Sequence, residues 1–404
     1  MKAEFLEELE FGPDVLGPDS TVDATPLLAL KYPAMTPPDD LALHENRSCD
    51  TVMHWYAGPM ALEGYHAGWF RSEELTLYYV KGPENGPPLL FYPGQIDPWH
   101  SYQPTFEALS EHFTLYLMEH RGHGFSERSV PGLYRVVDYT QDAIQFIEHV
   151  IGEPAYITGH SLGGMMCMAT WDLRPDLVRG LSIEDPPIFA MSKKAYEESF
   201  LDDFTFKQAR IRGRGVQEGS LSLVRAQRHV SEAPMLLPPA DVLPEEKQRA
   251  RFVDWLMNRM GLGAMLGILP EQDRNFYLAA FDRYVKDGEP GKRGDYLPFP
   301  FLEPREEAWI YTDWRTSCSH FGGRWIEGWE ERRSLASLSV PTIFWLSDLD
   351  ISPIRTADDC EDIKSLLAEV EKSWEFILVD GAGHYIHKEE TQRFTDAIVA
   401  HFLG

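Results

Sequence analysis

The amino-acid sequence predicts an α/β protein built on a mostly parallel sheet, flanked by helices and carrying a large, mainly helical insertion. Short, continuously apolar segments alternate with helix-like segments from about residue 88 to residue 184, and the alternation returns from about residue 340 to the end. Strands that are buried on both faces of a parallel sheet have this continuous apolar character, and helices are the usual connections between them. Residues 188–335 interrupt the pattern.

The individual elements follow in chain order. Residues 66–73 and 75–81 are predicted to form a hairpin ahead of the parallel strands. After the hairpin, apolar runs of strand length alternate with segments of helical spacing. The predicted strands are 88–92, 113–118, 155–158, 181–184, 340–346 and 374–379. The predicted helices are 102–112, 137–150, 162–173, 355–371 and 389–403.

These elements divide the chain into three parts. Residues 1–60 are rich in proline and acidic side chains, which predicts an N-terminal extension that wraps over a domain or is partly disordered. Residues 61–187 and 336–404 are predicted to form the core. Residues 188–335 carry helix-like segments, Pro and Gly breaks and many aromatic side chains. We interpret them as a lid inserted into the core.

The charge balance excludes two classes of partner. The chain has 37 Lys plus Arg against 64 Asp plus Glu, which gives a formal net charge of −27. Such a charge repels phosphate backbones and anionic lipids, so neither a nucleic acid nor a membrane surface is an expected partner. The sequence also has no apolar run of about 18 residues that would predict a membrane-spanning helix.

Two features predict a cytoplasmic protein. The acidic residues 1–10 lack the basic and apolar segments of a signal peptide. The four cysteines never occur as C-x-x-C, which argues against a disulfide framework and fits a reducing compartment. They are Cys49, Cys167, Cys318 and Cys360.

The motif that carries the predicted chemistry is Gly159-His160-Ser161-Leu162-Gly163, a G-x-S-x-G sequence. A predicted strand precedes it and a helix follows, so Ser161 is expected on a sharp strand-to-helix turn with an exposed hydroxyl. The flanking glycines fit this interpretation, because side chains there would clash with neighbouring backbone. The alternative is an ordinary turn in which Ser161 only caps the helix.

With this motif, other segments give the chain a resemblance to the α/β-hydrolase family over about residues 67–404. The run from Glu119 to Ser126, Glu-His-Arg-Gly-His-Gly-Phe-Ser, resembles the family's D-x-R-G-x-G-x-S segment, with Glu119 where Asp is usual. Gly-Ala-Gly-His, ending at His384, resembles the G-x-G-H that carries the family's base. Pro93 stands where the family has a His that supports the oxyanion loop. The resemblance implies fold and machinery but is nearly silent on the substrate.

The resemblance implies a catalytic triad in the order Ser161, Asp350, His384. A serine hydroxyl needs a base within hydrogen-bond reach, and the base needs an orienting acid. His384 follows a predicted strand and a glycine-rich turn, and Asp350 follows the preceding strand. Other carboxylates stay open as the acid because they also end strands, and some family members place the acid after the nucleophile helix. These alternatives are Asp348, Glu184 and Asp185.

The resemblance also implies an oxyanion hole made of two backbone amides, those of Leu162 and Gln95. We further expect Trp99 and Phe125 from core loops, together with aromatic side chains of the lid, to roof an apolar pocket over Ser161. Most of the lid's aromatic side chains are expected to form its own small core.

The predicted function is a serine hydrolase that cleaves a carboxylic ester or lactone of a bulky hydrophobic small molecule through an acyl-enzyme on Ser161. A carbon–carbon bond hydrolase or a proline aminopeptidase-like enzyme with the same triad stays open, as does a ligand-sensing receptor. No metal is expected, since the spaced histidine pairs lack a convincing third ligand, and no nucleotide-binding glycine motif predicts a cofactor. The oligomeric state is left open, with a homodimer as one option.

Overall fold

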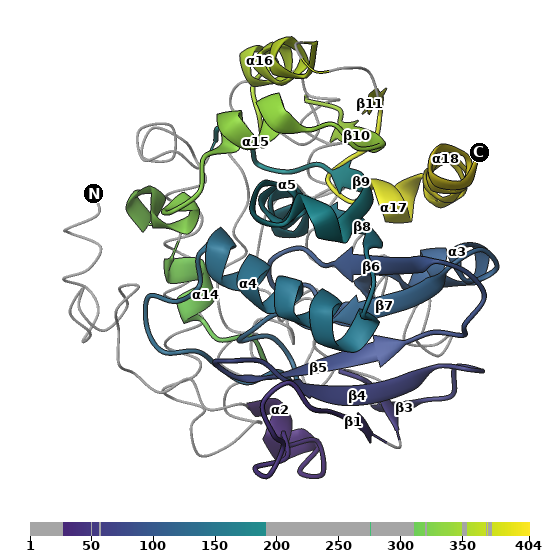
Figure 1. The fold of residues 1–404 in the computed structure, drawn as a ribbon, viewed down its shortest axis with the longest axis vertical. Coiled ribbons are helices and arrows are strands. Elements are labelled where there is room, and N and C mark those ends of the chain that lie inside the picture. The colour runs from purple at the N-terminus through teal and green to yellow at the C-terminus, as the bar shows by residue number, and fades with distance from the viewer. Residues whose placement is uncertain are drawn as a thin grey trace.

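A nine-stranded sheet organises the protein, in the strand order β1-β4-β5-β7-β6-β8-β9-β10-β11 (Figure 1). The computed structural model describes residues 27–49, 51–55, 58–190, 275, 311–319, 321–349, 354–368, 370 and 374–404. The strands of the sheet are β1 (Asn46–Cys49), β4 (His66–Arg71), β5 (Thr76–Lys81), β6 (Pro88–Tyr92), β7 (Thr114–Met118), β8 (Ala155–His160), β9 (Val178–Glu184), β10 (Thr342–Ser347) and β11 (Trp374–Val379).

The order of the strands reverses at one point of the sheet. The strands from β7 to β11 in the sheet order run parallel, and β5, β4 and β1 extend the sheet antiparallel. The chain proceeds outward from β6 to β7, crosses back to β8, and then proceeds in the opposite direction to β11. Ligand sites of open α/β sheets form at such reversals, beyond the carboxyl ends of the strands. Here the reversal lies between β6 and β8.

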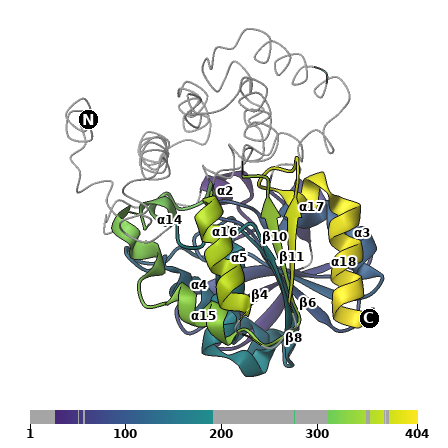
Figure 2. The same cartoon turned by 90° about the horizontal axis from the view of Figure 1, so that it is seen from above.

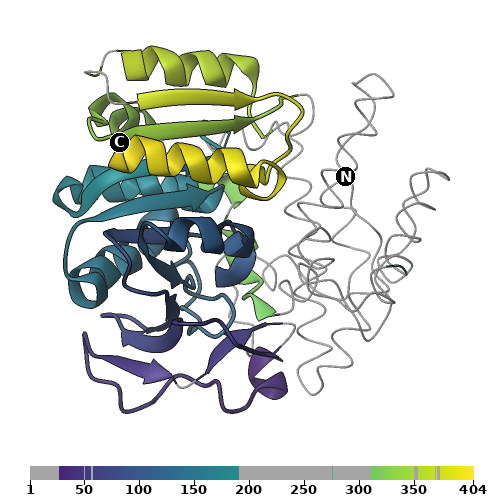
Figure 3. The same cartoon turned by 90° about the vertical axis from the view of Figure 1, so that its right-hand side faces the viewer.

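Helices cover both faces of the sheet (Figure 2). On one face lie α3 (Phe106–Ser110), α17 (Ile386–Glu389) and α18 (Thr391–Leu403). On the other face lie α4 (Val136–Phe146), α5 (Leu162–Leu173), α15 (Glu331–Ser337) and α16 (Ala357–Ala368). Figure 3 shows β10 and β11 between α16 and α18. Each face has its own apolar core, with Phe394 of α18 in one and Met165 of α5 in the other.

The parallel strands are the apolar runs of the sequence. β6 and β11 occupy the predicted ranges, and every residue of β6, β7 and β10 is buried. The predicted hairpin is β4 paired with β5. A strand buried on both faces needs apolar side chains at successive positions, which is why these segments are recognisable in the sequence.

Two predicted helices differ from the observed ones. Residues 102–112 do not form one helix, because Pro104 lies within a 3-10 segment, η2 (Trp99–Thr105), and only the short α3 follows. Proline has no amide hydrogen to donate to a continuous α-helix. The predicted helix 389–403 is α18, which begins only at Thr391 because the backbone of Glu390 is not helical (φ −121°, ψ 42°), and the short α17 precedes it.

Part of the predicted N-terminal extension is built into the core. β1 pairs antiparallel with β4, and β2 (Val52–His54) and β3 (Gly58–Met60) form a separate ribbon. Trp55 is fully buried, and its backbone N–H donates to His100 Nε2 at 3.3 Å. A short helix, α2 (Leu27–Lys31), precedes these strands. Residues 1–26 lie outside the described residues.

Most of the predicted lid also lies outside the described residues, which resume at residue 311 after the isolated residue 275. The last part of that segment contains α14 (Arg315–Cys318) and η6 (Phe321–Ile326). It is bonded to the core, since Tyr134 Oη donates to Asp313 Oδ2 at 2.7 Å. Among the residues that the structure describes, no helix is both long and apolar enough to cross a membrane.

Candidate active site

Ser161 stands on a strained turn between β8 and α5. Its backbone lies at φ 55° and ψ −113°, in a region that side-chain-bearing residues rarely adopt. Both motif glycines are required by space: a Cβ at Gly159 would lie 2.2 Å from Gly163 O, and one at Gly163 would lie 1.9 Å from Tyr92 O. The Ser161 amide donates to Glu184 O at 2.8 Å, which ties the turn to the end of β9. The sequence therefore forms the tight turn that the G-x-S-x-G motif predicts.

His384 lies in the loop after β11 and is mostly buried. Its Nδ1 lies 2.5 Å from Asp185 Oδ2. The neighbouring turn contacts the same loop, because His160 Nε2 donates to the His384 carbonyl at 2.9 Å and the two imidazole rings lie 4.3 Å apart. Ser161, which follows His160 directly, and His384 thus belong to one edge of the sheet.

Asp185 is the carboxylate that contacts this imidazole. It directly follows β9 with φ 43°, and it is fully buried. Its Oδ1 accepts the amide of Ser347 at 2.9 Å, the hydroxyl of Ser347 at 2.7 Å and Arg355 Nη2 at 2.5 Å. Burial alone would raise the pKa of Asp185, but the charge of Arg355 and the hydrogen bond with His384 outweigh it and hold this pKa well below its ordinary value. Asp185 is therefore ionised beside His384.

The other carboxylates considered as the acid have different surroundings. Asp350 lies outside the described residues. Asp348 Oδ2 accepts the Gly381 amide at 3.1 Å, and its own amide donates to Ala382 O, so it binds the turn that leads to His384. Glu184 is fully buried, and its Oε2 lies 2.7 Å from His387 Nδ1.

The loop after β6 contains Gln95, whose amide is one of the two expected oxyanion donors. Ile96 has φ 73°, and its amide donates to His123 Nε2 at 3.0 Å. His123 Nδ1 in turn lies 2.9 Å from the Arg121 carbonyl, so the accepting Nε2 and the donating Nδ1 define one neutral tautomer. His120 Nε2 donates to Pro93 O at 2.8 Å, and burial lowers the pKa of His120 to about 4. Two histidines thus support this loop from outside, although Pro93 replaces the family's usual histidine.

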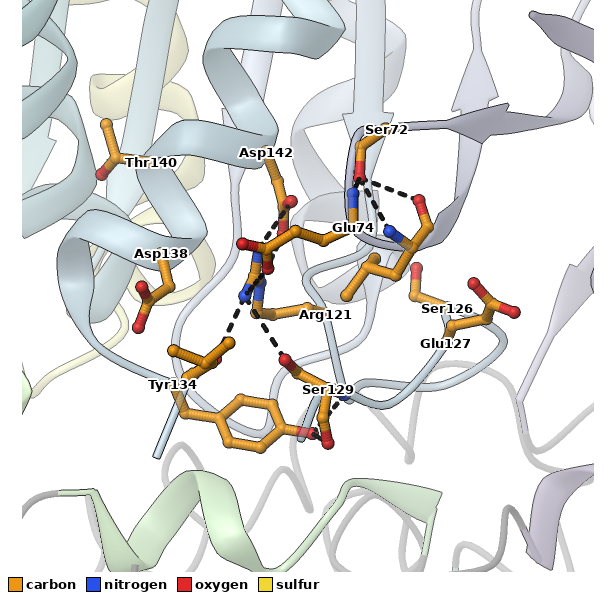
Figure 4. A network of polar contacts seen from close by, with 12 residues as sticks. Ser72, Glu74, Arg121, Ser126, Glu127, Ser129, Tyr134, Asp138, Thr140 and Asp142 are labelled. Carbon is orange, nitrogen blue, oxygen red and sulfur yellow. Dashed lines mark hydrogen bonds and ion pairs between the residues drawn. The ribbon is translucent and has the colours of Figure 1, made fainter. Parts of the chain in front are cut away.

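The segment that carries these two histidines is itself anchored (Figure 4). Arg121 is buried and donates to both oxygens of Asp142 on α4, at 2.7 and 2.8 Å. It also forms an ion pair with Glu74, in the turn between β4 and β5, at 2.8 Å. A bidentate, charge-assisted pair fixes orientation as well as distance. Arg121 therefore holds the loop after β7 against both α4 and the β4–β5 turn.

The remaining predicted site residues occupy different surroundings. Leu162 begins α5, directly after Ser161. Trp99 is fully buried, and its Nε1 donates to Met53 O at 3.1 Å. Phe125 packs against Tyr78 with ring centroids 5.2 Å apart and lines a cavity of about 510 Å³ between the N-terminal segment and the β4–β5 turn. In the described part of the chain, no group of three or more His, Cys, Asp or Glu side chains is arranged to hold a metal ion.

Sequence reasoning did not find Arg355 and Ser347 as partners of Asp185. Nothing in the sequence assigns either residue a role beside Asp185, and they lie 170 and 162 residues after it along the chain. The available signal was only that β9 and β10 are neighbours, which places the loops that follow them side by side.

Comparisons with known proteins agree with this fold. A family model described as alpha/beta hydrolase fold matches residues 87–232. A 2-(acetamidomethylene)succinate hydrolase of Mesorhizobium japonicum is 32% identical over 102 residues, which are 25% of this chain and 36% of that protein. RutD of Serratia proteamaculans, provisionally named a carbamate hydrolase, is 29% identical over 146 residues, which are 36% of this chain and 48% of that protein. The chain thus spans about half, or less, of the length of these relatives.

A solved structure extends the likeness over most of the chain. An epoxide hydrolase from an endophytic Streptomyces superposes with a TM-score of 0.54 at 14% identity. The match covers 84% of this chain and 96% of the other. At this identity the likeness concerns the fold alone.

Proposed function

This chain belongs to the α/β-hydrolase fold family, and from that premise we propose that it is a serine hydrolase with Ser161 as nucleophile, His384 as base and Asp185 as acid. The observation that carries the proposal is the 2.5 Å contact of His384 Nδ1 with a buried, ionised Asp185, next to a serine on a strained strand-to-helix turn. An imidazole held in this way can accept the proton of a serine hydroxyl. Asp185 takes the role for which Asp350 was the first sequence-based choice.

In the proposed reaction, Ser161 Oγ attacks a carbonyl carbon while His384 Nε2 takes the hydroxyl proton. The carbonyl oxygen becomes an oxyanion that accepts hydrogen bonds from the amides of Leu162 and Gln95. His384 then protonates the leaving group, and an acyl-enzyme remains on Ser161. Water, deprotonated by His384, releases the acid and restores the serine.

We propose that the bond is a carboxylic ester or lactone of a bulky hydrophobic small molecule. The large inserted segment, residues 188–335, is rich in aromatic side chains, which suit an apolar substrate. An ester also has a leaving group that one imidazole can protonate. One relative is provisionally named a carbamate hydrolase and the other is named a 2-(acetamidomethylene)succinate hydrolase, so a carbamate belongs in the substrate panel.

Labelling with a fluorophosphonate probe tests the nucleophile. The wild-type protein is expected to form one adduct on Ser161, and Ser161→Ala is expected to form none and to lose esterase activity. Ser110→Ala is the matched control, because Ser110 lies on α3, away from the strand-to-helix turn. A folded wild-type protein that is not labelled on Ser161 would contradict the proposal.

Turnover of a substrate panel tests the bond. The panel contains aryl esters of increasing acyl size, a lactone, an aryl carbamate, a diketone and an amino-terminal proline amide. The ester or lactone is expected to react fastest. Faster turnover of the diketone or the proline amide would assign the same machinery to another bond, and tight ligand binding without turnover of any member would favour a receptor.

A further inference from the structure

A second buried carboxylate–imidazole pair lies directly beside the first. Glu184 precedes Asp185, and His387 lies three residues after His384. Glu184 Oε1 and Oε2 lie 2.8 and 2.7 Å from His387 Nδ1, and Oε1 also accepts the His387 amide at 2.9 Å. Both side chains are fully buried, so neither can touch a substrate.

This pair joins three segments that surround the proposed triad. Glu184 ends β9, His387 lies in α17, and His387 Nε2 lies 3.3 Å from the carbonyl of Ser101 in η2. The His387 ring stacks on Tyr102, also in η2, with centroids 4.1 Å apart. In addition, the Glu184 carbonyl accepts the Ser161 amide. One residue therefore contacts the nucleophile's turn with its backbone and the base's loop with its side chain.

The partners of His387 define how many protons the pair holds. A carbonyl only accepts, so Nε2 donates to Ser101, and the hydrogen between Nδ1 and Glu184 is a second proton that the two side chains share. Burial raises the pKa of Glu184 to about 7 and holds the pKa of His387 well below its ordinary value. Below about pH 7 the pair is therefore electrically neutral overall and has no uncompensated charge in the core.

We propose that Glu184 and His387 form a positioning pair that holds the loop of His384 at a fixed distance and orientation from Asp185 and Ser161. The inference rests on the proposed function. Two consecutive carboxylates bind two histidines that lie three residues apart along the chain. A single contact would still allow the loop to pivot, whereas two parallel contacts fix its rotation as well. Small displacements of a proton-transferring group reduce the reaction rate steeply, so loss of this positioning pair should slow catalysis.

The decisive variant removes both members of the pair together. Glu184→Leu with His387→Phe replaces both side chains of the pair by apolar groups of similar shape, although the His387 amide and the Ser101 carbonyl lose their partners. The folded fraction of this variant is therefore measured before its rate. In the double variant, kcat for an activated ester and the rate of fluorophosphonate labelling should both fall about ten- to hundredfold, with KM changed by less than about twofold. A purely structural role would lower the folded fraction, and thus the amount of active enzyme, without this uniform fall per folded molecule.

Glu184→Gln is the conservative variant. Its amide oxygen can accept the His387 amide while its NH₂ donates to Nδ1, which reproduces the protonated pair. It should recover most of the wild-type kcat. Tyr156→Phe is the matched control, because it removes a partly buried hydrogen bond, 2.9 Å long, from Tyr156 Oη to Phe402 O at the opposite end of β8. It should leave kcat unchanged.

The outcomes separate the two proposals. A wild-type protein that is not labelled on Ser161 overturns the proposed function, and the positioning role falls with it. Wild-type labelling together with unchanged kcat in the folded double variant overturns the positioning role alone. If the double variant does not fold, the single variants decide. A hundredfold loss of kcat per folded molecule in Glu184→Gln overturns the positioning role. Wild-type kcat in Glu184→Gln together with a reduced kcat in His387→Phe supports that role.

Discussion

Arg355 Nη2 lies 2.5 Å from Asp185 Oδ1, and both side chains are fully buried. The other oxygen of this carboxylate contacts His384. The proposed acid is therefore shared between a permanent cation and the proposed base. Because a guanidinium stays charged at all accessible pH values, it keeps Asp185 ionised but also opposes the positive charge that His384 acquires during catalysis.

Replacing this cation should move the pH dependence of the reaction. In Arg355→Met the imidazolium form of His384 loses a nearby repulsive charge. A larger fraction of His384 is then protonated at a given pH. The acidic limb of kcat/KM should shift to higher pH by about half to one unit. Arg174→Met, at a surface arginine paired with Asp176, is the control and should leave the limb in place. A shift to lower pH would contradict this reading of the contact.

The identity of the acid is tested by comparing three variants in which one Asp is replaced by Asn. Asp185→Asn should lower kcat by about a thousandfold or more, because an amide can neither hold the neutral imidazole in its working tautomer nor offset the charge of the imidazolium. Asp348→Asn and Asp350→Asn should change kcat by less than about tenfold. Rates are measured with one activated ester, on protein whose folded fraction is known from circular dichroism. If Asp350→Asn gives the largest loss, the acid is Asp350.

This choice illustrates where sequence information ends. The apolar runs predicted the strands, and G-x-S-x-G predicted the strained turn of Ser161, because both depend on neighbouring residues. Chain order alone cannot select between the ends of β9 and β10, since these strands are neighbours and both ends reach the same edge. The selection depends on Ser347 and Arg355, which approach Asp185 only after folding.

The N-terminal part shows the same limit. β1 has the polar sequence Asn-Arg-Ser-Cys and is only half-buried, so no apolar periodicity marks it as a strand. It pairs with β4, whose edge would otherwise present a row of unpaired backbone N–H and C=O groups. A strand of this kind is specified by its neighbour and not by its own composition.

The motif glycines should differ sharply from glycines elsewhere. Gly163→Ala would place a Cβ 1.9 Å from the Tyr92 carbonyl oxygen, and we expect it to lower the free energy of unfolding by about 3 kcal/mol or more. Gly152→Ala meets nothing within 4 Å and faces only its positive φ of 77°, so about 1 kcal/mol is expected. Urea unfolding measures both. Equal effects would mean that the turn yields more easily than its contacts imply.

Glu119 should make stability depend on pH. Burial raises its pKa from 4.5 to about 8, although the amide of Phe125 and the indole of Trp55 donate to it. Because the folded-state pKa is above the unfolded value, its stabilising contribution is complete below about pH 4.5 and is lost as the pH rises through about 8. Because a Gln side chain cannot ionise, the free energy of unfolding of Glu119→Gln should fall over this interval by about 2–4 kcal/mol less than that of the wild type.

Urea unfolding at several pH values between 5 and 9 measures this difference directly. The difference between the free energies of unfolding of the variant and the wild type isolates the contribution of Glu119. Other buried carboxyls with raised pKa values, such as Glu184 and Glu331, are present in both proteins and cancel. Glu107→Gln, at an exposed position of α3, is the matched control and should follow the wild-type curve. Parallel curves for wild type and Glu119→Gln would mean that the carboxyl is ionised throughout, held by Trp55 and the Phe125 amide more strongly than burial opposes it.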